Sequence, residues 1–132
     1  MRIYPPAPII GRSVTEDVDL GDFILPAGTS LAVGIIGTHR DPETWPNPMK
    51  FDPDRFLPEE VAKRHPCSYI PFSVGPRNCI GLKFAMMEMK VLVATILRAY
   101  KINTSMKPEN MKLSLEIVCK IIGGYNISIK KR

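Results

Sequence analysis

The sequence predicts an α+β chain: small antiparallel β elements, a long meander ending in a cysteine loop, one long amphipathic helix at about 80–100, and a C-terminal β hairpin. Three observations predict this arrangement. Twelve of the thirteen prolines lie at or before Pro76, which makes the first half irregular. Apolar residues recur at helical spacing directly after Gly81. Two strand-like segments near the C-terminus flank Gly123 and Gly124.

The first part of the chain is predicted to form short strands. Residues 1–4 are expected to end a helix that Pro5 and Pro6 stop, because proline lacks a backbone donor and disfavours helix in the residue before it. Glycine and proline turn signals then separate several apolar stretches. The predicted strands of this small antiparallel sheet are 9–10, 13–18, 23–25 and 30–36.

Residues 40–81 are the predicted meander, because they show little periodicity and a proline every few residues. Only short helical turns at 38–41 and 58–63 are expected here. Compact domains seldom contain irregular segments beyond roughly 15 residues unless these are functional or wrap another element. We therefore expect the meander to lie over a partner segment.

The helix at about 80–100 is the most regular predicted element, with apolar residues on one face and charged residues on the other. The apolar positions are Leu82, Ala85, Met86, Met89, Leu92, Val93, Ile96, Leu97 and Tyr100. Beyond the helix, 113–120 and 125–130 are predicted to pair as a closing hairpin, and 101–104 as an additional strand.

Length and composition exclude several classes of protein. A chain of 132 residues has room for one modest core, and its 45% hydrophobic and 23% charged residues are typical of globular proteins. No apolar run exceeds four residues, so no membrane span or signal peptide is predicted. The net charge of +5 is spread along the chain, and no nucleic-acid partner is expected. Three cysteines without a C-x-x-C pair indicate free thiols and a reducing compartment.

Cys79 stands just before the predicted helix, where free backbone N–H groups and the helix dipole favour an anion such as a thiolate. Gly75 and Gly81 permit sharp turns around it, and Arg77 supplies a cation two residues away. Haem iron takes a thiolate ligand, and the haem propionates would suit Arg77. The alternative is that Cys79 is a small buried apolar residue, as many free cysteines are.

The residues around Cys79 resemble the cysteine signature F-x-x-G-x-R-x-C-x-G of the haem-thiolate monooxygenases, the cytochromes P450. Here it reads F-S-V-G-P-R-N-C-I-G at 72–81, with every fixed position present. H-R-D-P at 39–42, W-P-N-P at 45–48 and F-D-P-D-R-F at 51–56 extend the similarity. The last of these resembles the P-E-R-F element, with Asp54 in place of glutamate. The sequences of these motifs are most similar to those of the microsomal fatty-acid ω-hydroxylase branch, of family 4 type.

The resemblance implies roles for individual residues around a thiolate-ligated haem b. Cys79 is expected to be the iron ligand, Phe72 to shield its sulfur, and Arg77 to bind a propionate. Gly75 and Gly81 would shape the loop, and Arg12 would be a second propionate contact.

The family also fastens its cysteine loop with a Glu-x-x-Arg pair bonded to the arginine of P-E-R-F. Arg2 and Arg55 match the two arginines of this structural clamp. The glutamate would stand three residues before Arg2, ahead of Met1. We therefore expect a clamp without its carboxylate, with both cations uncompensated.

By resemblance, residues 1–132 are the C-terminal, proximal haem-binding part of a single cytochrome P450 domain of mostly α fold. The N-terminal anchor, distal helix and substrate-recognition segments are expected to lie outside it. The full-length parent would insert one atom of O2 into a lipophilic substrate, such as a fatty acid or xenobiotic. Electrons would come from NADPH-cytochrome P450 reductase at the cytoplasmic face of the endoplasmic reticulum membrane. The isolated chain is expected to be catalytically incomplete.

Two other hypotheses stay open: a cofactor-free remnant or small interaction module, and a chain that binds haem without catalysis. A basic face for the reductase would comprise Arg64, Arg77, Lys83, Lys90 and Lys101, with an ordinary solvated surface as its alternative. His39, His65, Trp45 and Phe56 are expected to have structural rather than catalytic roles.

Overall fold

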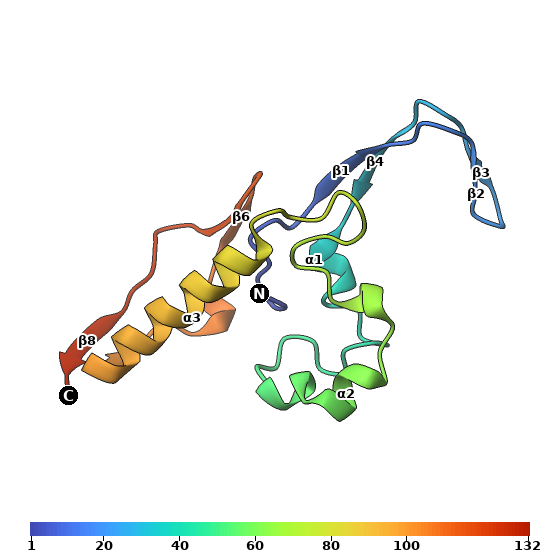
Figure 1. The fold of residues 1–132 in the computed structure, drawn as a ribbon. Helices are drawn as coiled ribbons and strands as arrows, with labels where there is room; N and C mark the ends of the chain where they lie inside the picture. The colour runs from blue at the N-terminus through green and yellow to red at the C-terminus, as the bar shows by residue number, and fades with distance from the viewer. The chain divides into compact units, whose positions relative to one another are not determined.

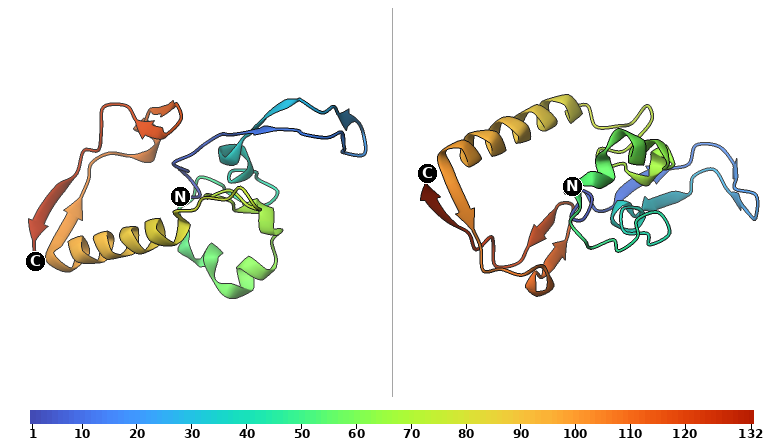
Figure 2. Two further views of the ribbon diagram at one scale, coloured as in Figure 1. Left: turned by 45° about the horizontal axis from the view of Figure 1, so that its top comes forward. Right: turned by 90° about the horizontal axis from the view of Figure 1, so that it is seen from below.

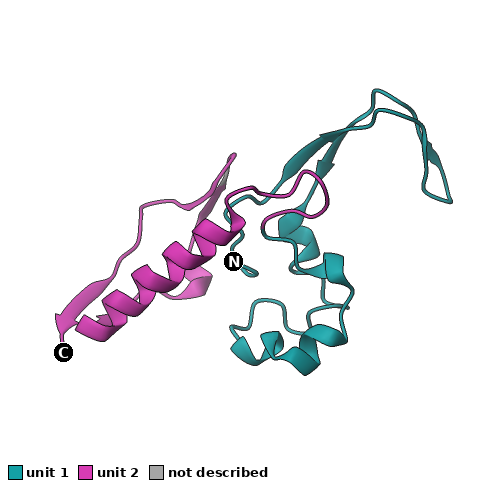
Figure 3. Ribbon diagram, viewed as in Figure 1, with its two compact units in different colours: residues 1–71 teal, residues 72–132 magenta. Residues whose placement is uncertain are grey.

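The computed structural model describes residues 1–132, apart from the side chain of Leu115. The chain divides into two compact units, residues 1–71 and residues 72–132 (Figure 3). They are called unit 1 and unit 2 below. This differs from the single core that the chain length suggested.

Unit 1 begins with two antiparallel strand pairs (Figures 1 and 2). Strand β1, Ile10–Ser13, pairs with β4, Ser30–Val33, so that Arg12 lies opposite Leu31. The chain between them forms a second hairpin, in which β2, Val18–Asp19, pairs with β3, Ile24–Leu25. The predicted strand 13–18 is wrong, because the ladder between β1 and β4 ends at Ser13 and β2 begins at Val18. Residues 1–4 are also not helical.

The meander of unit 1 contains only short helical segments. Helix α1 spans Ile35–Thr38 and α2 spans Pro58–Ala62, while the 3-10 helices η1 and η2 span Pro53–Phe56 and Pro66–Ser68. Three of them start with proline, whose fixed φ suits the first helical position and whose missing N–H has no partner there in any case. The turn predicted at 58–63 is confirmed, and the one predicted at 38–41 lies slightly earlier in the chain.

The interior of unit 1 is small. Among the described side chains, Ile35 and Trp45 are the buried large apolar ones, and His39 and Arg2 are buried beside them. Trp45 has ring contacts with Phe56 at 6.0 Å and Tyr69 at 6.4 Å, measured between ring centroids. The prediction that Trp45 packs the meander is confirmed.

Unit 2 begins with the cysteine loop, residues 72–81, and continues into helix α3, Leu82–Ala99. This helix lies within the span of about 80–100 expected from the apolar spacing. Burial does not follow the predicted apolar face, since Leu92, Val93 and Leu97 are exposed, as is Phe84. Unit 2 therefore has no buried apolar side chain among those described.

The C-terminal strands pair differently from the prediction. Strand β5, Tyr100–Asn103, follows α3 directly and pairs with β8, Ser128–Lys131. Strand β6, Leu113–Leu115, pairs with β7, Cys119–Ile121, and the short helix η3, Pro108–Asn110, precedes them. The predicted hairpin between 113–120 and 125–130 is therefore wrong. Residues 113–120 contain a turn of their own, at which Glu116 accepts from Ser114 and pairs with Lys120.

No helix in the described chain combines the length and the apolar character that crossing a bilayer requires.

Candidate functional site

The cysteine loop closes on itself through backbone hydrogen bonds. The Cys79 N–H donates to the carbonyl of Phe72 at 2.9 Å, and the Asn78 N–H donates to the carbonyl of Gly75 at 3.1 Å. The first bond joins the start of the signature to its cysteine, and the second closes a turn within it. These backbone hydrogen bonds hold Cys79 at a defined position before α3.

The two glycines of the loop play different conformational roles. Gly75 has φ of 83°, in the left-handed region that side chains with a Cβ adopt at a cost. Gly81 has φ of −83°, which any residue can adopt, and an added Cβ would lie 3.8 Å from the Cys79 Sγ. Only Gly75 is needed for its backbone conformation, whereas Gly81 keeps the space beside the sulfur open. Gly81 still lies in a turn, as predicted, because the Leu82 N–H donates to the carbonyl of Cys79 at 3.3 Å; this turn does not require glycine.

Cys79 lies at the amino end of α3, where Gly81 is the N-cap residue. The first turn of α3 contains no acidic residue that would compete for the free N–H groups. Cys79 is exposed, and the next residue, Ile80, is fully exposed. The Cys79 thiol is therefore exposed, and Gly81 beside it has no side chain. A flat ligand could approach the sulfur from this side.

The other predicted haem residues are distributed over both units. Arg77 is exposed in the cysteine loop, two residues before Cys79, and has an interaction partner within the chain. Phe72 is half-buried and contributes its carbonyl to the loop closure. Arg12 lies on β1 in unit 1, where one of its amino groups donates to the carbonyl of Gly11 at 2.8 Å. The loop thus groups Cys79 with Arg77 and Phe72, but Arg12 belongs to the other unit.

Arg2 is buried, with 5% of its surface exposed, yet it forms no ion pair among the described residues. Its guanidinium donates to the carbonyls of His39 at 2.8 Å, Pro48 at 2.5 Å and Lys50 at 3.3 Å. Burial, and then the neighbouring Arg55, lower the pKa of Arg2 below its usual value. This buried cation is held by carbonyl dipoles and not by an anion.

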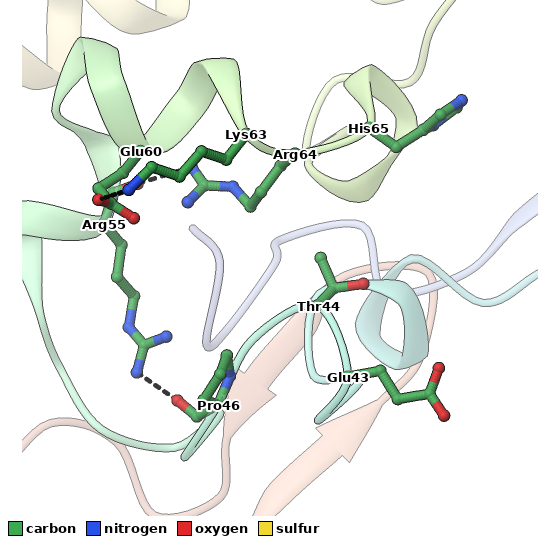
Figure 4. A pocket seen from close by; sticks show the side chains of 8 residues that line it. All are labelled: Glu43, Thr44, Pro46, Arg55, Glu60, Lys63, Arg64 and His65. Carbon is green, nitrogen blue, oxygen red and sulfur yellow. Dashed lines mark hydrogen bonds and ion pairs between the residues drawn. The ribbon is translucent and has the colours of Figure 1, made fainter.

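Arg55 binds the same segment as Arg2, because it donates to the carbonyls of Pro46 at 2.6 Å and Asn47 at 3.3 Å. Figure 4 shows its side chain extending to Pro46 across a pocket of about 380 Å³. Its buried Nε has no hydrogen-bond partner within the described residues. The structure thus brings Arg2 and Arg55 to residues 46–50 and leaves the Nε donor of Arg55 without a partner among the described residues.

Arg64 has a role that the sequence did not reveal. Its guanidinium lies 4.3 Å from the Trp45 ring centroid, while that of Arg2 lies 5.0 Å from the same ring. It also donates to the carbonyl of Arg55 at 2.6 Å. Arg64 is therefore an internal contact of the meander rather than part of the predicted basic docking face. The only sequence signal for these cation–π contacts is that residues 40–64 contain several arginines and a tryptophan.

The histidines have structural roles, as predicted. His39 is completely buried, and its Nε2 accepts from the Ile70 N–H at 2.9 Å. Burial lowers the pKa of His39 to about 4, so it is neutral at physiological pH. His65 caps η2 by accepting from the Cys67 N–H at 3.1 Å. Among the described residues, no group of three or more His, Cys, Asp or Glu side chains is placed to hold a metal ion.

The comparisons with known proteins agree with the motifs. The family model described as Cytochrome P450 matches residues 1–127. The chain is 46% identical to Cytochrome P450 4g1 and 45% identical to Cytochrome P450 4c3, both of Drosophila melanogaster, and 41% identical to Cytochrome P450 4V2 of Homo sapiens. Each match covers 100% of this chain but only 24 to 25% of the relative, so the chain spans about a quarter of their length. On this coverage, the chain belongs to the cytochrome P450 family.

Proposed function

We propose that the cysteine loop binds haem b through the thiolate of Cys79, as the proximal part of a monooxygenase. The family uses haem whose iron is ligated by a cysteine thiolate. The observation that carries the proposal is the closed 72–81 loop, which presents an exposed Cys79 beside Gly81 at the start of α3. When bound, the haem would supply the O2-activating iron, with the sulfur donating electron density to it.

The remaining residues of the proposed site position and shield the thiolate. The Cys79 main chain is fixed by the Phe72 carbonyl, and the Phe72 side chain is proposed to keep water from the sulfur. Arg77 would pair with a propionate as a fixed cation, and Arg12 would be a second contact. Gly81 would let the cofactor approach, because it has no side chain beside the Sγ.

Arg2 and Arg55 are proposed to form the structural clamp that supports the cysteine loop in the longer protein. The unpartnered Nε of Arg55 and the buried, anion-free Arg2 support this proposal. A glutamate supplied by a preceding segment would satisfy both, through charge-assisted hydrogen bonds. Residues 1–132 would then be the C-terminal, proximal part of one P450 domain.

We further propose that the full-length protein inserts one atom of O2 into a lipophilic substrate, with a fatty acid or a xenobiotic as candidates. Electrons would come from NADPH-cytochrome P450 reductase at the cytoplasmic face of the endoplasmic reticulum membrane. The similarity to family 4 members supports the branch, and the substrate remains a proposal from that similarity. The isolated chain is expected to show no turnover, because it spans only about a quarter of the length of the family 4 members to which it is similar.

The test is the absorption spectrum of the haem-reconstituted 132-residue chain, reduced and bound to carbon monoxide. A thiolate-type band is expected for the unchanged chain and for Cys67→Ala, which removes the other exposed thiol. The band should be absent in Cys79→Ala. A second readout is alkylation, since bound haem should protect Cys79 but not Cys67. A thiolate band that survives in Cys79→Ala, or equal protection of both thiols, would contradict the proposed ligand.

A cofactor-free interaction module is the second candidate function. The exposed apolar side chains of α3, such as Phe84 at 66% and Leu92 at 58%, favour it, since they are available to a partner. A monodisperse chain without haem, showing neither a thiolate band nor protection of Cys79, would support this alternative.

A further inference from the structure

The charged residues are divided unequally between the two units. Unit 2 contains eleven Lys or Arg and three Asp or Glu, a net charge of +8, whereas unit 1 contains seven and ten, a net charge of −3. Residues 89–108 and 117–132 contain no acidic residue at all. These two segments include β5 and β8, so the strand pair has no acidic side chain of its own.

The register of β5 and β8 places Lys101, Lys130 and Arg132 on one face of this strand pair, and Lys131, opposite Tyr100, on the other. Lys101 stands directly opposite Lys130, and Asn103 stands opposite Ser128. The ladder continues to Arg132, whose N–H donates to the carbonyl of Ala99 at 3.0 Å. Because alternate residues of a strand share a face, Lys101, Lys130, Arg132, Asn103 and Ser128 lie together. This set is called the strand basic face.

Like charges placed directly opposite each other destabilise a strand pair. Both lysines are exposed, and neither forms an ion pair within the described residues. The ion pair found in unit 2 joins Lys120 to Glu116 instead. Arg132 is already used, because its Nε donates to the carbonyl of Leu97 at 2.8 Å near the end of α3. The repulsion between Lys101 and Lys130 is thus not offset within the chain, and an external anion would offset it.

We propose that the strand basic face binds an acidic protein segment. Beside the charges, Asn103 offers its side-chain amide as a donor, as the rim of a protein interface does, whereas the Ser128 hydroxyl already donates to the carbonyl of Asn103 at 3.5 Å. The strand basic face contains no apolar side chain to enter a bilayer, since Tyr100, Ile102 and Ile129 lie on the opposite face. It also contains no aromatic ring on which nucleic-acid bases would stack.

This surface is separate from the reductase proposal. Lys83 and Lys90 lie on α3, whereas Lys101 and Lys130 lie on the strands that follow it. The register with Lys130 assigns Lys101 to the strand basic face. The two proposals can therefore fail independently, because they depend on different pairs of lysines.

The test is the fluorescence anisotropy of a labelled short polyglutamate peptide titrated with the complete 132-residue chain. Lys101→Gln together with Lys130→Gln should weaken binding roughly five- to tenfold, the effect expected of two exposed charge pairs. Lys101→Arg with Lys130→Arg should keep the affinity, because the charges stay. Lys107→Gln with Lys112→Gln is the matched control, with the same loss of charge outside the strand pair, and should weaken binding less than about twofold.

Folding is monitored in the same variants. Removing the opposed lysines should leave the thermal midpoint unchanged or raise it, since a like-charge repulsion is lost. Equal weakening by the control pair would overturn the proposal, because net charge alone would then explain the binding. Binding to phosphatidylserine vesicles or to an oligothymidylate, lost in the same double variant while polyglutamate fails to bind, would overturn it in favour of a membrane or a nucleic acid.

Discussion

Trp45 provides the most direct test of how unit 1 is stabilised. It is completely buried, contacts Phe56 and Tyr69, and has the guanidinium groups of Arg2 and Arg64 over its ring, at 5.0 Å and 4.3 Å from the centroid. Replacing a buried tryptophan with alanine costs about 3–5 kcal/mol, and each lost cation–π contact adds about 0.5–2 kcal/mol. A unit of this size has a total stability of about 4–10 kcal/mol. Trp45→Ala is therefore expected to leave unit 1 largely unfolded.

Trp45→Phe is the matched control. The indole Nε1 is buried without a hydrogen-bond partner in the described chain, and such a donor costs about 1–3 kcal/mol. Phenylalanine removes that unsatisfied donor and keeps an aromatic ring for the two guanidinium groups to contact. The loss in unfolding free energy should therefore be less than half of that for Trp45→Ala.

The assay is urea denaturation of the 132-residue chain followed by far-ultraviolet circular dichroism. Because Trp45 is the single tryptophan, its fluorescence in the unchanged chain reports the unfolding of unit 1 independently. An unaltered transition in Trp45→Ala would refute the reasoning, since a buried ring would then contribute nothing. Equal losses in the two variants would show that the unpartnered N–H has no cost.

Three further predictions concern His39, Gly75 and Arg64. The folded-state pKa of His39, about 4, lies below its usual value of 6.5, so the unfolded chain binds the proton more tightly and stability falls as pH drops through that range. The unfolding free energy should fall by about 3 kcal/mol over this pH range. The fall should be smaller in His39→Gln, because glutamine does not titrate but can still accept from the Ile70 N–H. Equal urea midpoints near pH 4 and the same pH dependence in the two proteins would contradict this. Gly75→Ala should lower the stability of the loop by about 1–2 kcal/mol, because Gly75 has a positive φ, and should weaken haem binding in a titration. Gly81→Ala should have a smaller effect on both. A larger effect of Gly81→Ala would show that the space beside the sulfur matters more than backbone strain. Arg64→Lys should lower the unfolding free energy by about 1–2 kcal/mol, because it removes the stacking on Trp45 and the hydrogen bond to the Arg55 carbonyl. The control Lys63→Gln, which removes an exposed ion pair, should change it by less than about 0.5 kcal/mol. Similar urea midpoints for the two variants would refute the internal role of Arg64.

Local features of this protein could be predicted from the sequence because they depend on neighbouring residues. The helix after Gly81 follows from apolar spacing, and the turn at Pro58 follows from a proline that suits the first helical position. The cysteine signature was recognised as a run of ten residues, without any knowledge of contacts. The family assignment rests on such runs and agrees with the family model.

Contacts between distant residues could not be predicted in the same way. Strand β8 pairs with β5 rather than with residues 113–120, because β6 and β7 close a hairpin of their own and leave β5 as its partner. The packing of Arg64 on Trp45 and the burial of His39 depend on how the proline-rich meander folds back on itself.

The sequence by itself determined the family and the position of Cys79 before a helix. Only the tertiary structure decided that Arg2 is buried without an anion, that Arg55 keeps an unpartnered Nε, and that Lys101 faces Lys130. The physical reason is that helices and turns are stabilised by interactions along a few consecutive residues. Burial, strand register and the pairing of charges depend instead on which distant segments meet.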